Sequence, residues 1–370
     1  MESADEGLTP LDALFLQRAY ELAARGIGSS APNPPVGAVV VRDGRVVGEG
    51  FHRRAGEPHA EAEALAEAGA QARGATLYVS LEPCKHIGRT PPCTQALLQA
   101  GIARVVAGTH DPSEHGGGAA LLKSRGVDVA VTNDAAAREL IESFARASTS
   151  RKPYVALKMA MSLDGAIGGR PGVREQLTGA RTASYVRDLR AACDAVMVGA
   201  NTVRVDDPLL TVRPPRHRAR PYRRVVACER EPIAKTSRVF DDQPGYDRTI
   251  VLAPSGRSER FEALREKADV VYVGEGGALR LDPIAALEAL RLRGIFSVLC
   301  EGGPKLAAAL IAADAVDRFY WAIAPTMLAN ERAVAVLSGS DLTQTKLRPR
   351  FDRFERLGDD LMIAGTFERV

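Results

Sequence analysis

The chain has 370 residues, 45% of them hydrophobic and 26% charged, which predicts two globular domains that each bury a core. Its 49 basic and 46 acidic residues give a formal net charge of +3, so a nucleic-acid partner is not expected. No apolar run reaches the roughly 20 residues of a membrane span, and the acidic segment 1–9 does not resemble a signal peptide. We therefore expect a cytoplasmic protein with no membrane partner.

The first part of the chain alternates helical and strand patterns. Thr9 followed by Pro10 is a typical start of a helix, here predicted to run to about residue 25. Hydrophobic patterning then predicts strands at 36–41, 45–50, 75–81, 104–108 and 127–131, and helices at 59–68, 92–100 and 119–125. This alternation predicts an α/β sandwich.

A short segment of small and polar residues, 147–152, predicts a linker between two domains at 1–146 and 153–370. The second domain also alternates strands and helices. Strands are predicted at 154–161, 195–198, 224–227, 249–252, 270–273, 297–300, 319–324 and 361–367, and helices at 180–192, 283–293 and 304–313. The segment 213–224 is rich in arginine and proline and is predicted to be a loop.

The most specific pattern in the chain is a set of metal-ligand residue types. His59 is followed by Glu61 two positions later, then by Cys84 and by Cys93. Three protein ligands with an open fourth position are typical of catalytic zinc, which activates a water molecule. Glu61 is then placed to transfer protons, and the prolines before Cys93 place that thiol at a helix start, where a thiolate is favoured. This pattern predicts a zinc-dependent deaminase.

The alternative is that these residues have no role in metal binding, but their order along the chain argues against it. His-x-Glu is frequent by chance, and two cysteines can be core residues, yet Pro-His-Ala-Glu followed by Glu-Pro-Cys is hard to produce accidentally. The other cysteines lie in apolar runs, and we interpret them as core residues: Cys193, Cys228 and Cys300. An odd total of 5 cysteines argues against a disulfide framework.

The long inter-cysteine segment, 85–92, separates this chain from deaminases with a Pro-Cys-x-x-Cys motif. With the motifs at 31–37, 52–61, 157–165, 206–213 and 301–304, it resembles the bifunctional riboflavin-biosynthesis deaminase/reductase family over nearly its whole length. The resemblance implies a cytidine-deaminase-like α/β/α sandwich followed by a dihydrofolate-reductase-like α/β domain.

The resemblance also implies two reactions in sequence. The first is zinc-dependent deamination of 2,5-diamino-6-ribosylamino-4(3H)-pyrimidinone 5′-phosphate. The second is reduction of the ribosyl group of the resulting aminouracil by NADPH. A phosphorylated pyrimidine is therefore the expected partner, and members of the family are often homo-oligomers.

Residue roles follow from matched motif positions. Asn33 and His52 are expected to contact the pyrimidine in the deaminase, although Asn33 between prolines is also a common turn residue. The residues expected at the cofactor are Lys158, Ala160, Gln176, Thr202, Asp206, Gly302, Gly303, Pro304 and Lys305. The glycines precede a predicted helix, whose start can bind a phosphate, but a plain turn has the same sequence.

The residues expected at the reductase substrate are Arg174, Arg190, Leu210, Arg213 and Glu301. Arg190 and Arg213 are expected to bind the substrate phosphate, since one guanidinium group can donate two parallel hydrogen bonds to two phosphate oxygens. Arg190 could instead be a solvated charge on its helix.

Three segments differ from the family pattern. Residues 113–118 form a shorter loop after Asp111-Pro112, and 329–331 replace a glycine-rich turn. Arg174 and Gln176 lie where a Ser-x-Trp motif is common. These differences leave two alternatives open: a paralogue that acts on another aminopyrimidine, and a deaminase whose C-terminal half only binds a ligand.

Overall fold

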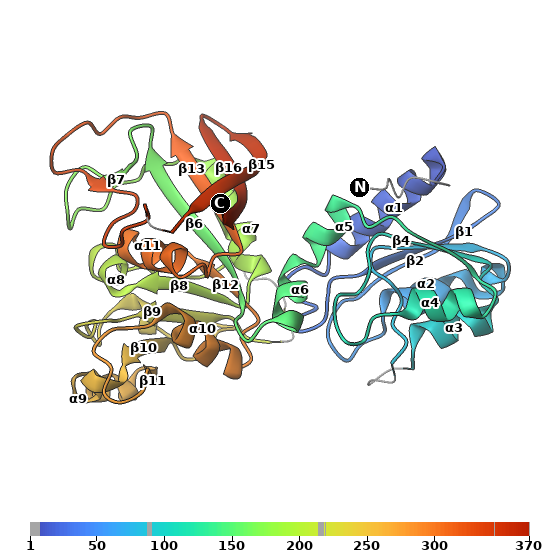
Figure 1. The fold of residues 1–370 in the computed structure, drawn as a ribbon, viewed down its shortest axis with the longest axis horizontal. Coiled ribbons are helices and arrows are strands. Elements are labelled where there is room, and N and C mark those ends of the chain that lie inside the picture. Colours follow the sequence, from blue (N-terminus) through green and yellow to red (C-terminus); the bar gives the residue numbers. More distant parts are fainter. Residues whose placement is uncertain (1–7, 87–90, 214–217, 219, 344, 370) are drawn as a thin grey trace. The chain divides into compact units, whose positions relative to one another are not determined.

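The computed structural model describes residues 8–86, 91–213, 218, 220–343 and 345–369. The chain forms two compact units, one that includes residues up to Ser150 and one that includes nearly all residues from Arg151 onward (Figure 1). Each unit contains its own sheet and its own hydrophobic cores.

The first unit is built on a five-stranded sheet with strand order β2-β1-β3-β4-β5. Strands β1 and β2 form an antiparallel hairpin and β1 pairs antiparallel with β3, whereas β3, β4 and β5 are parallel. The strands are β1 (Gly37–Arg42), β2 (Arg45–Phe51), β3 (Thr76–Val79), β4 (Arg104–Ala107) and β5 (Asp128–Val131).

Helices cover both faces of this sheet, because successive strand residues point to opposite faces and apolar residues lie on both. Ala38, Leu77 and Val105 pack on one face with the apolar sides of α2, α3 and α4, while Val39 and Val106 face α1 and α5. The helices are α1 (Pro10–Ala24), α2 (Ala60–Ala68), α3 (Cys93–Ala100), α4 (Gly118–Ser124), α5 (Ala135–Leu140) and α6 (Glu142–Thr149), with a 3-10 turn at Gly69–Ala72. The predicted α/β/α sandwich is therefore confirmed (Figure 1).

Two glycines let α2 lie directly on the sheet. A Cβ at Gly48 would lie 2.2 Å from the Ala64 carbonyl oxygen, and one at Gly50 would lie 2.4 Å from that of Ala60. Any side chain at these positions would push the helix outward. This close contact fixes the position of the first turn of α2, which follows His59.

Helix α6 extends into the predicted linker, 147–152, and the division between the two units falls within the same segment, after Ser150. Helix α6 continues to Thr149, so residues 147–149 are helical, and only a few residues separate it from β6. The polar residues of this segment are as common at an exposed helix end as in a loop. Its alanine favours helix. Helices α5 and α6 were not predicted, since each spans fewer than three turns.

The second unit is built on a nine-stranded sheet with order β11-β10-β9-β8-β12-β6-β13-β16-β15. Following this spatial order, all neighbouring strands from β11 through to β13 pair in parallel. Strand β16 then pairs antiparallel with β13, and β15 pairs antiparallel with β16. The strands are β6 (Tyr154–Ser162), β8 (Ala195–Gly199), β9 (Arg223–Ala227), β10 (Ile250–Pro254), β11 (Asp269–Val273), β12 (Ser297–Cys300), β13 (Arg318–Ala324), β15 (Leu347–Leu357) and β16 (Asp360–Arg369). A small separate pair joins β7 (Ala166–Gly168) to β14 (Val334–Ala335).

Helices again cover both faces of the sheet. Leu287 and Leu310 place α10 and α11 on the face that includes Val155 and Val298, and Val203 places α8 on the other face, where α7 also packs. The helices are α7 (Ala180–Ala192), α8 (Ala200–Asp206), α9 (Ser258–Phe261), α10 (Pro283–Leu292) and α11 (Pro304–Ala312), with 3-10 turns at Arg238–Phe240, Ser255–Arg257 and Glu262–Glu266. Cys193, Cys228 and Cys300 are buried, which confirms their predicted place in the cores.

Several elements of the second unit were not predicted: α8, α9, β7, β14 and β15. Strand β15 carries charged residues at most positions and is exposed along most of its length, so it lacks the apolar pattern of a core strand. The loop expected at 213–224 lies partly outside the described residues, and its last two residues belong to β9.

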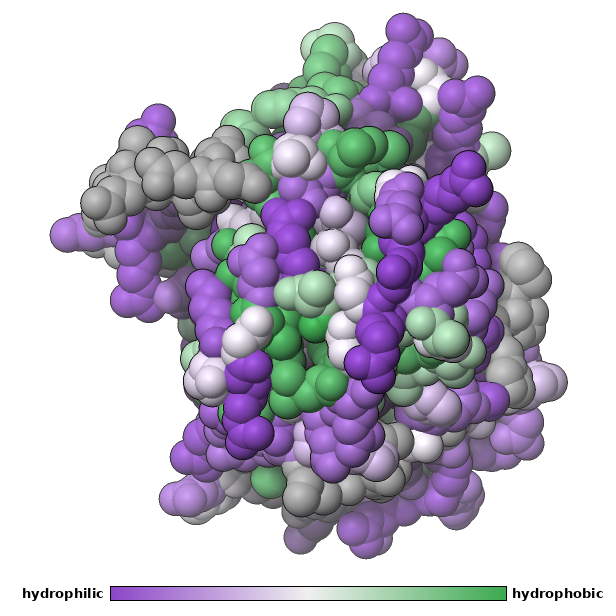
Figure 2. All heavy atoms as spheres, turned by 90° about the vertical axis from the view of Figure 1, so that its right-hand side faces the viewer, coloured by the Kyte–Doolittle hydropathy of each residue, from purple (hydrophilic) through white to green (hydrophobic). Residues whose placement is uncertain are grey.

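The surface carries both hydrophilic and apolar residues. In Figure 2, hydrophilic residues border a central group of apolar residues on the face in view. Large exposed apolar side chains include Leu11 and Leu14 of α1 and Phe351 and Phe354 of β15. Across the ranges described, no helix combines the length and the hydrophobicity that a bilayer span requires.

Candidate active sites

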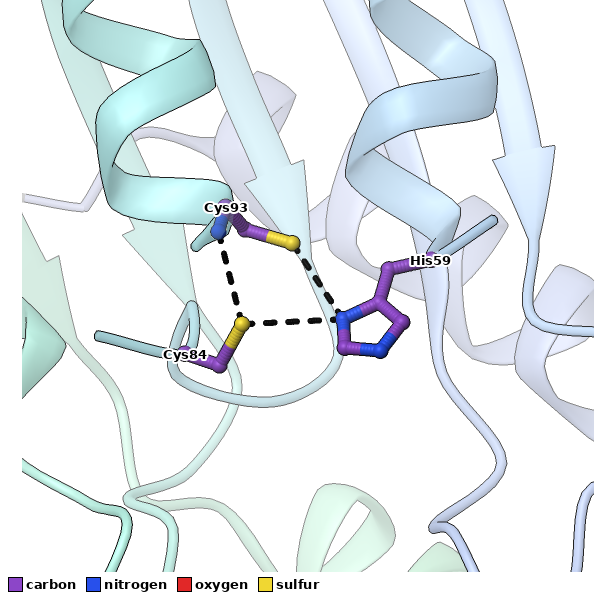
Figure 3. Close-up of side chains that lie close together, drawn as sticks. All are labelled: His59, Cys84 and Cys93. Atoms are coloured by element: carbon purple, nitrogen blue, oxygen red, sulfur yellow. Dashed lines mark hydrogen bonds between the residues drawn. The ribbon is translucent and has the colours of Figure 1, made fainter. Parts of the chain in front are cut away.

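The predicted metal ligands meet at one point in the first unit (Figure 3). His59 caps the start of α2, Cys93 is the first residue of α3, and Cys84 lies in the loop that follows β3. The Nδ1 atom of His59 lies 3.6 Å from the Cys84 sulfur and 3.3 Å from the Cys93 sulfur. The three donor atoms all lie within 4.8 Å of one another.

This arrangement fits a zinc ion. A tetrahedral ion with bonds of about 2.3 Å to sulfur and about 2.1 Å to nitrogen separates two such ligand atoms by about 3.6 Å. The neighbouring Cys93 thiol and the His59 ring lower the pKa of the Cys84 thiol against the effect of burial, which favours a thiolate there. One imidazole and two thiols are a ligand set typical of zinc, and they leave a fourth position for water.

Glu61 lies in the first turn of α2, two residues after His59, with only 3% of its surface exposed. Burial, together with the nearby Cys84 sulfur, raises the pKa of Glu61 to about 7. A bound divalent cation would oppose this shift. A carboxylate whose pKa lies near neutrality can both accept and donate a proton.

Asn33 and His52 lie beside the ligands. The Asn33 side-chain nitrogen is 3.0 Å from His52 Nε2, and His52 Nδ1 is 3.0 Å from the Pro58 carbonyl oxygen. His52 must therefore donate from Nδ1 and accept at Nε2, as a neutral ring does. Burial lowers the pKa of His52, which favours the same neutral form. The His52 and His59 rings lie 5.2 Å apart, edge to face.

Glu82 organises the loop beside the metal ligands, a role that the sequence analysis missed. Its buried carboxylate accepts hydrogen bonds from the backbone N–H groups of Ala119 at 2.7 Å and Asp111 at 3.1 Å. Burial acts to raise the pKa of Glu82, but these backbone hydrogen bonds outweigh it and lower the pKa. The only sequence signal was its position directly before Pro83-Cys84.

The loop that departs from the family pattern packs against the segment that carries Cys84. A Cβ at Gly118 would lie 1.8 Å from the Pro83 carbonyl oxygen, so the contact requires glycine. The rings of His86 and His115 stack at 4.0 Å. The short loop is thus held close to the metal-ligand segment rather than away from it.

In the second unit, a cavity of about 1410 Å³ opens at the carboxyl ends of the parallel strands. Strands β8 and β12 are neighbours, but the chain leaves β8 toward β9 and leaves β12 toward β13 on the other side. Ligands of α/β proteins bind at such a change of direction. Helices α8 and α11 both begin here, so their free N–H groups can bind an anionic ligand.

A glycine turn forms part of this cavity wall. The Gly199 N–H donates to the Gly302 carbonyl oxygen at 2.8 Å, which ties the ends of β8 and β12 together. Gly302 has a φ of +83°, and a Cβ there would lie 2.9 Å from the Met159 sulfur. A residue with a side chain is therefore excluded at Gly302.

Some of the predicted reductase residues line the cavity and others do not. The cavity wall includes Arg174, Thr202, Asp206, Gly303, Pro304 and Lys305. The residues outside its lining are Lys158, Ala160, Gln176, Arg190, Leu210, Arg213, Glu301 and Gly302. Leu210 is buried in the apolar core beside α8, and the exposed Gln176 side chain donates to the Thr178 carbonyl oxygen.

Arg190, Glu301 and Lys158 form a partly buried group of charges. Arg190 donates from Nε and Nη2 to the two Glu301 carboxylate oxygens, at 2.5 and 2.7 Å, and from Nη1 to the Thr211 carbonyl oxygen. Burial acts to raise the pKa of Glu301, but Arg190 outweighs it and keeps the pKa low. Burial lowers the pKa of Lys158, against the opposing charge of Glu301. Arg190 is therefore an ion-pair partner rather than a solvated helix charge.

Together the two units define a class of enzyme, a zinc-dependent deaminase joined to an oxidoreductase that uses a nicotinamide cofactor. Residues 10–109 match the cytidine and deoxycytidylate deaminase zinc-binding region. Residues 153–363 match the RibD C-terminal domain. The chain therefore belongs to the RibD family of bifunctional riboflavin-biosynthesis enzymes.

Full-length relatives support this assignment. The chain is 38% identical to riboflavin biosynthesis protein RibD of Aquifex aeolicus over 95% of its length and 98% of the relative. It is 36% identical to the Escherichia coli protein over 95% of the chain and 98% of that protein. The predicted family, both fold classes and both enzyme activities are confirmed, and neither alternative function is favoured.

Solved structures agree over the same length. The structure of Acinetobacter baumannii RibD is similar with a TM-score of 0.82 and 32% identity, over 97% of this chain and 99% of that one. A Thermotoga maritima structure gives 0.81 and 34% identity, over 96% of this chain and 98% of that one. That protein is described as a diaminohydroxyphosphoribosylaminopyrimidine deaminase/5-amino-6-(5-phosphoribosylamino)uracil reductase.

Proposed function

We propose that the chain catalyses two consecutive steps of riboflavin biosynthesis. The first is deamination of 2,5-diamino-6-ribosylamino-4(3H)-pyrimidinone 5′-phosphate, by residues 1–146. The second is NADPH-dependent reduction of the ribosyl group of 5-amino-6-(5-phosphoribosylamino)uracil, by residues 153–370. The observation that carries the proposal is the convergence of His59, Cys84 and Cys93 beside the buried Glu61.

In the first reaction, His59, Cys84 and Cys93 would hold zinc. When bound, zinc would act as a Lewis acid that lowers the pKa of water and so makes it a better nucleophile toward the ring carbon. The Glu61 carboxylate accepts the proton of the attacking water and donates it to the ring nitrogen, then assists departure of ammonia. Its burial keeps the proton from exchanging freely with solvent.

Asn33 and His52 orient the pyrimidine in this proposal. His52 Nε2 accepts from the Asn33 amide nitrogen, which fixes the amide so that its oxygen faces away from the ring of His52. An amide held in one orientation can recognise a ring edge with a defined donor and acceptor pattern. Both side chains are then positioning groups, while Glu61 carries the protons.

In the second reaction, the cofactor supplies the hydride and the protein positions the reactants. We place the nicotinamide dinucleotide in the large cavity, with its pyrophosphate at Thr202, Gly303 and the starts of α8 and α11. Asp206 and Lys305 line the same wall. Lys158, Ala160 and Gln176 remain proposed cofactor residues, although none of them lines the cavity.

The substrate would bind next to the buried charges. We propose that Arg190 and Arg213 hold its phosphate and that Glu301 and Leu210 help position its ribosyl end. Arg190 uses three of its five N–H groups within the protein, so two remain for phosphate oxygens. Arg174, in the cavity wall, adds a positive charge two residues before Gln176, which stands where the family commonly has an aromatic residue.

A coupled assay tests the proposal. The zinc-loaded chain should release one ammonia for each diaminopyrimidinone phosphate consumed, and NADPH should then be oxidised in equal amount. Ammonia release without NADPH oxidation would contradict the second activity. A reductase that accepts the uracil product but a first unit that releases no ammonia would contradict the first.

We also propose that the chain acts in the cytoplasm as a homo-oligomer on small molecules, without a nucleic-acid or membrane partner. Strand β15 is at an edge of the nine-stranded sheet and exposes Phe351 and Phe354, whose rings pack edge to face. An edge strand that exposes two aromatic rings is a surface that a second copy can cover. Phe354→Glu should then convert an oligomer to a monomer in analytical ultracentrifugation, and a wild-type monomer would contradict the idea.

A further inference from the structure

The cavity of the second unit extends well beyond the glycine turn. Its wall continues to the carboxyl end of β9, with Ala227 and Glu229 to Glu231, and to the start of α10, with Asp282 and Ala286. Its floor there is apolar and includes Leu252 and Leu287. An apolar floor next to a charged rim suits an adenosine group, which has a flat ring and a polar ribose.

The charges on this rim are not equivalent. Glu229 lies 3.4 Å from the Arg280 guanidinium, and Glu231 pairs with Arg260. Both carboxylates are thus neutralised by arginines. Arg230 lies between them in the sequence and is exposed, and no carboxylate of the described part of the chain lies within ion-pair distance of it.

This pattern distinguishes the two nicotinamide dinucleotides. A site for NADH usually presents a free carboxylate that accepts a hydrogen bond from the ribose 2′-hydroxyl, whereas a site for NADPH presents an arginine to the 2′-phosphate. Here Glu229 and Glu231 are paired with arginines, and the Asp282 carboxylate accepts a hydrogen bond from the Ala285 N–H at the start of α10. The Arg230 guanidinium is exposed just after the end of β9. A guanidinium also matches the geometry of phosphate oxygens, which it can bind in pairs.

We infer that Arg230 binds the 2′-phosphate of the cofactor and makes the reductase select NADPH over NADH. This inference rests on the proposed cofactor site and extends it to a specificity-determining residue. Glu229 and Glu231 contribute indirectly, because their pairing with Arg280 and Arg260 removes the repulsion that free carboxylates would exert on a phosphate.

Calorimetric titration of the full-length, zinc-loaded chain tests the inference without turnover. The wild type should bind NADPH at least tenfold more tightly than NADH. In Arg230→Gln, NADPH binding should weaken about tenfold to a hundredfold, the usual range for losing a charged hydrogen-bond partner. NADH binding should stay unchanged, and Arg230→Lys should recover part of the preference.

Two probes without nicotinamide locate the effect on the ribose. Arg230→Gln should weaken the binding of 2′,5′-ADP, which carries the 2′-phosphate, and leave the binding of AMP unchanged. Arg356→Gln is the matched control, since Arg356 is 81% exposed on β15 and does not line the cavity. This variant should bind all four ligands as the wild type does.

The negative results of these titrations can be told apart. A preference for NADPH that survives Arg230→Gln would contradict the role of Arg230 and leave the proposed cofactor intact. Equal weakening of NADPH and NADH would show a general effect on the cavity and would also contradict it. Binding of neither dinucleotide by the wild type would contradict the proposed cofactor, and the Arg230 assignment with it.

Discussion

At the scale of single residues, the deaminase chemistry depends on side chains that act at short range. His59 and Glu61 are fixed by the first turn of α2, whose contact with Gly48 and Gly50 leaves it little freedom to shift. Cys93 is the first residue of α3. Two rigid helix starts therefore position the proposed ligands and the proposed proton carrier relative to one another.

Glu61→Gln should keep the metal and lose the first reaction. The amide is nearly the same size but cannot accept a proton, so the rate of ammonia release should fall about 10²- to 10⁴-fold. Metal analysis should still find one zinc per chain, and NADPH oxidation with the uracil substrate should be unchanged. Glu21→Gln, on the exposed side of α1, is the control, and full deaminase activity in Glu61→Gln would refute the proton-transfer role.

At the scale of elements, short loops and helix ends hold the first unit in shape. Asp12, in the first turn of α1, closes a capping box with Thr9 and also accepts hydrogen bonds from Tyr78 and Arg104. Burial acts to raise the pKa of Asp12, but these hydrogen bonds, led by the one from Arg104, hold it well below the usual range. A lowered pKa in the folded state stabilises the fold above the pKa of the unfolded chain and loses this effect as the pH falls.

Asp12→Asn should therefore destabilise the first unit in a pH-dependent way. At pH 7 the loss should be roughly 2 kcal/mol, because the Arg104 side chain loses its charged partner. As the pH falls below about 4, Asp12 of the unfolded chain becomes protonated while the folded carboxylate keeps its charge, so the stabilisation from Asp12 and the difference between the two proteins should shrink. Urea unfolding followed by circular dichroism at pH 7 and pH 3 measures this. Asp43→Asn, at an exposed turn, should have little effect at either pH.

The loop held by Glu82 gives a second prediction at this scale. Glu82→Gln replaces one of the two carboxylate oxygens by an NH₂ group, which is a donor. The variant therefore has no acceptor for one of the two backbone N–H groups, that of Ala119 or that of Asp111. The segment 110–119 should then exchange its amide hydrogens faster, and the deaminase KM should rise about tenfold. Zinc content and NADPH oxidation should stay as in the wild type. Unchanged exchange in this segment would show that Glu82 does not hold the loop.

At the scale of the whole molecule, the two chemistries belong to separate units with separate cores. All three metal ligands lie before Ser150, and the large cavity is lined only by residues after Arg151. Removing zinc with a chelator should therefore abolish ammonia release and leave NADPH oxidation with the uracil substrate unchanged. Added zinc should restore the first activity, and a chelator that stops both reactions would contradict the separation.

The sequence alone determined the family and the fold of both units and led to the proposed ligands of the metal, because these depend on local patterns. The spacing of His59, Glu61, Cys84 and Cys93 is readable since helix starts follow from nearby prolines and alanine-rich segments. The strands of both cores were predicted for a similar reason, as apolar β-branched runs report burial.

Only the tertiary structure decided which distant residues meet. Arg190 and Glu301 are 111 positions apart, and no local pattern indicates that they form an ion pair. The same holds for Leu210 in the core, for Glu82 beneath its loop and for the exposed Arg230 at the cavity rim. Short helices such as α5 and α8 were also missed, since helices of this length are stable only through packing on the rest of the fold.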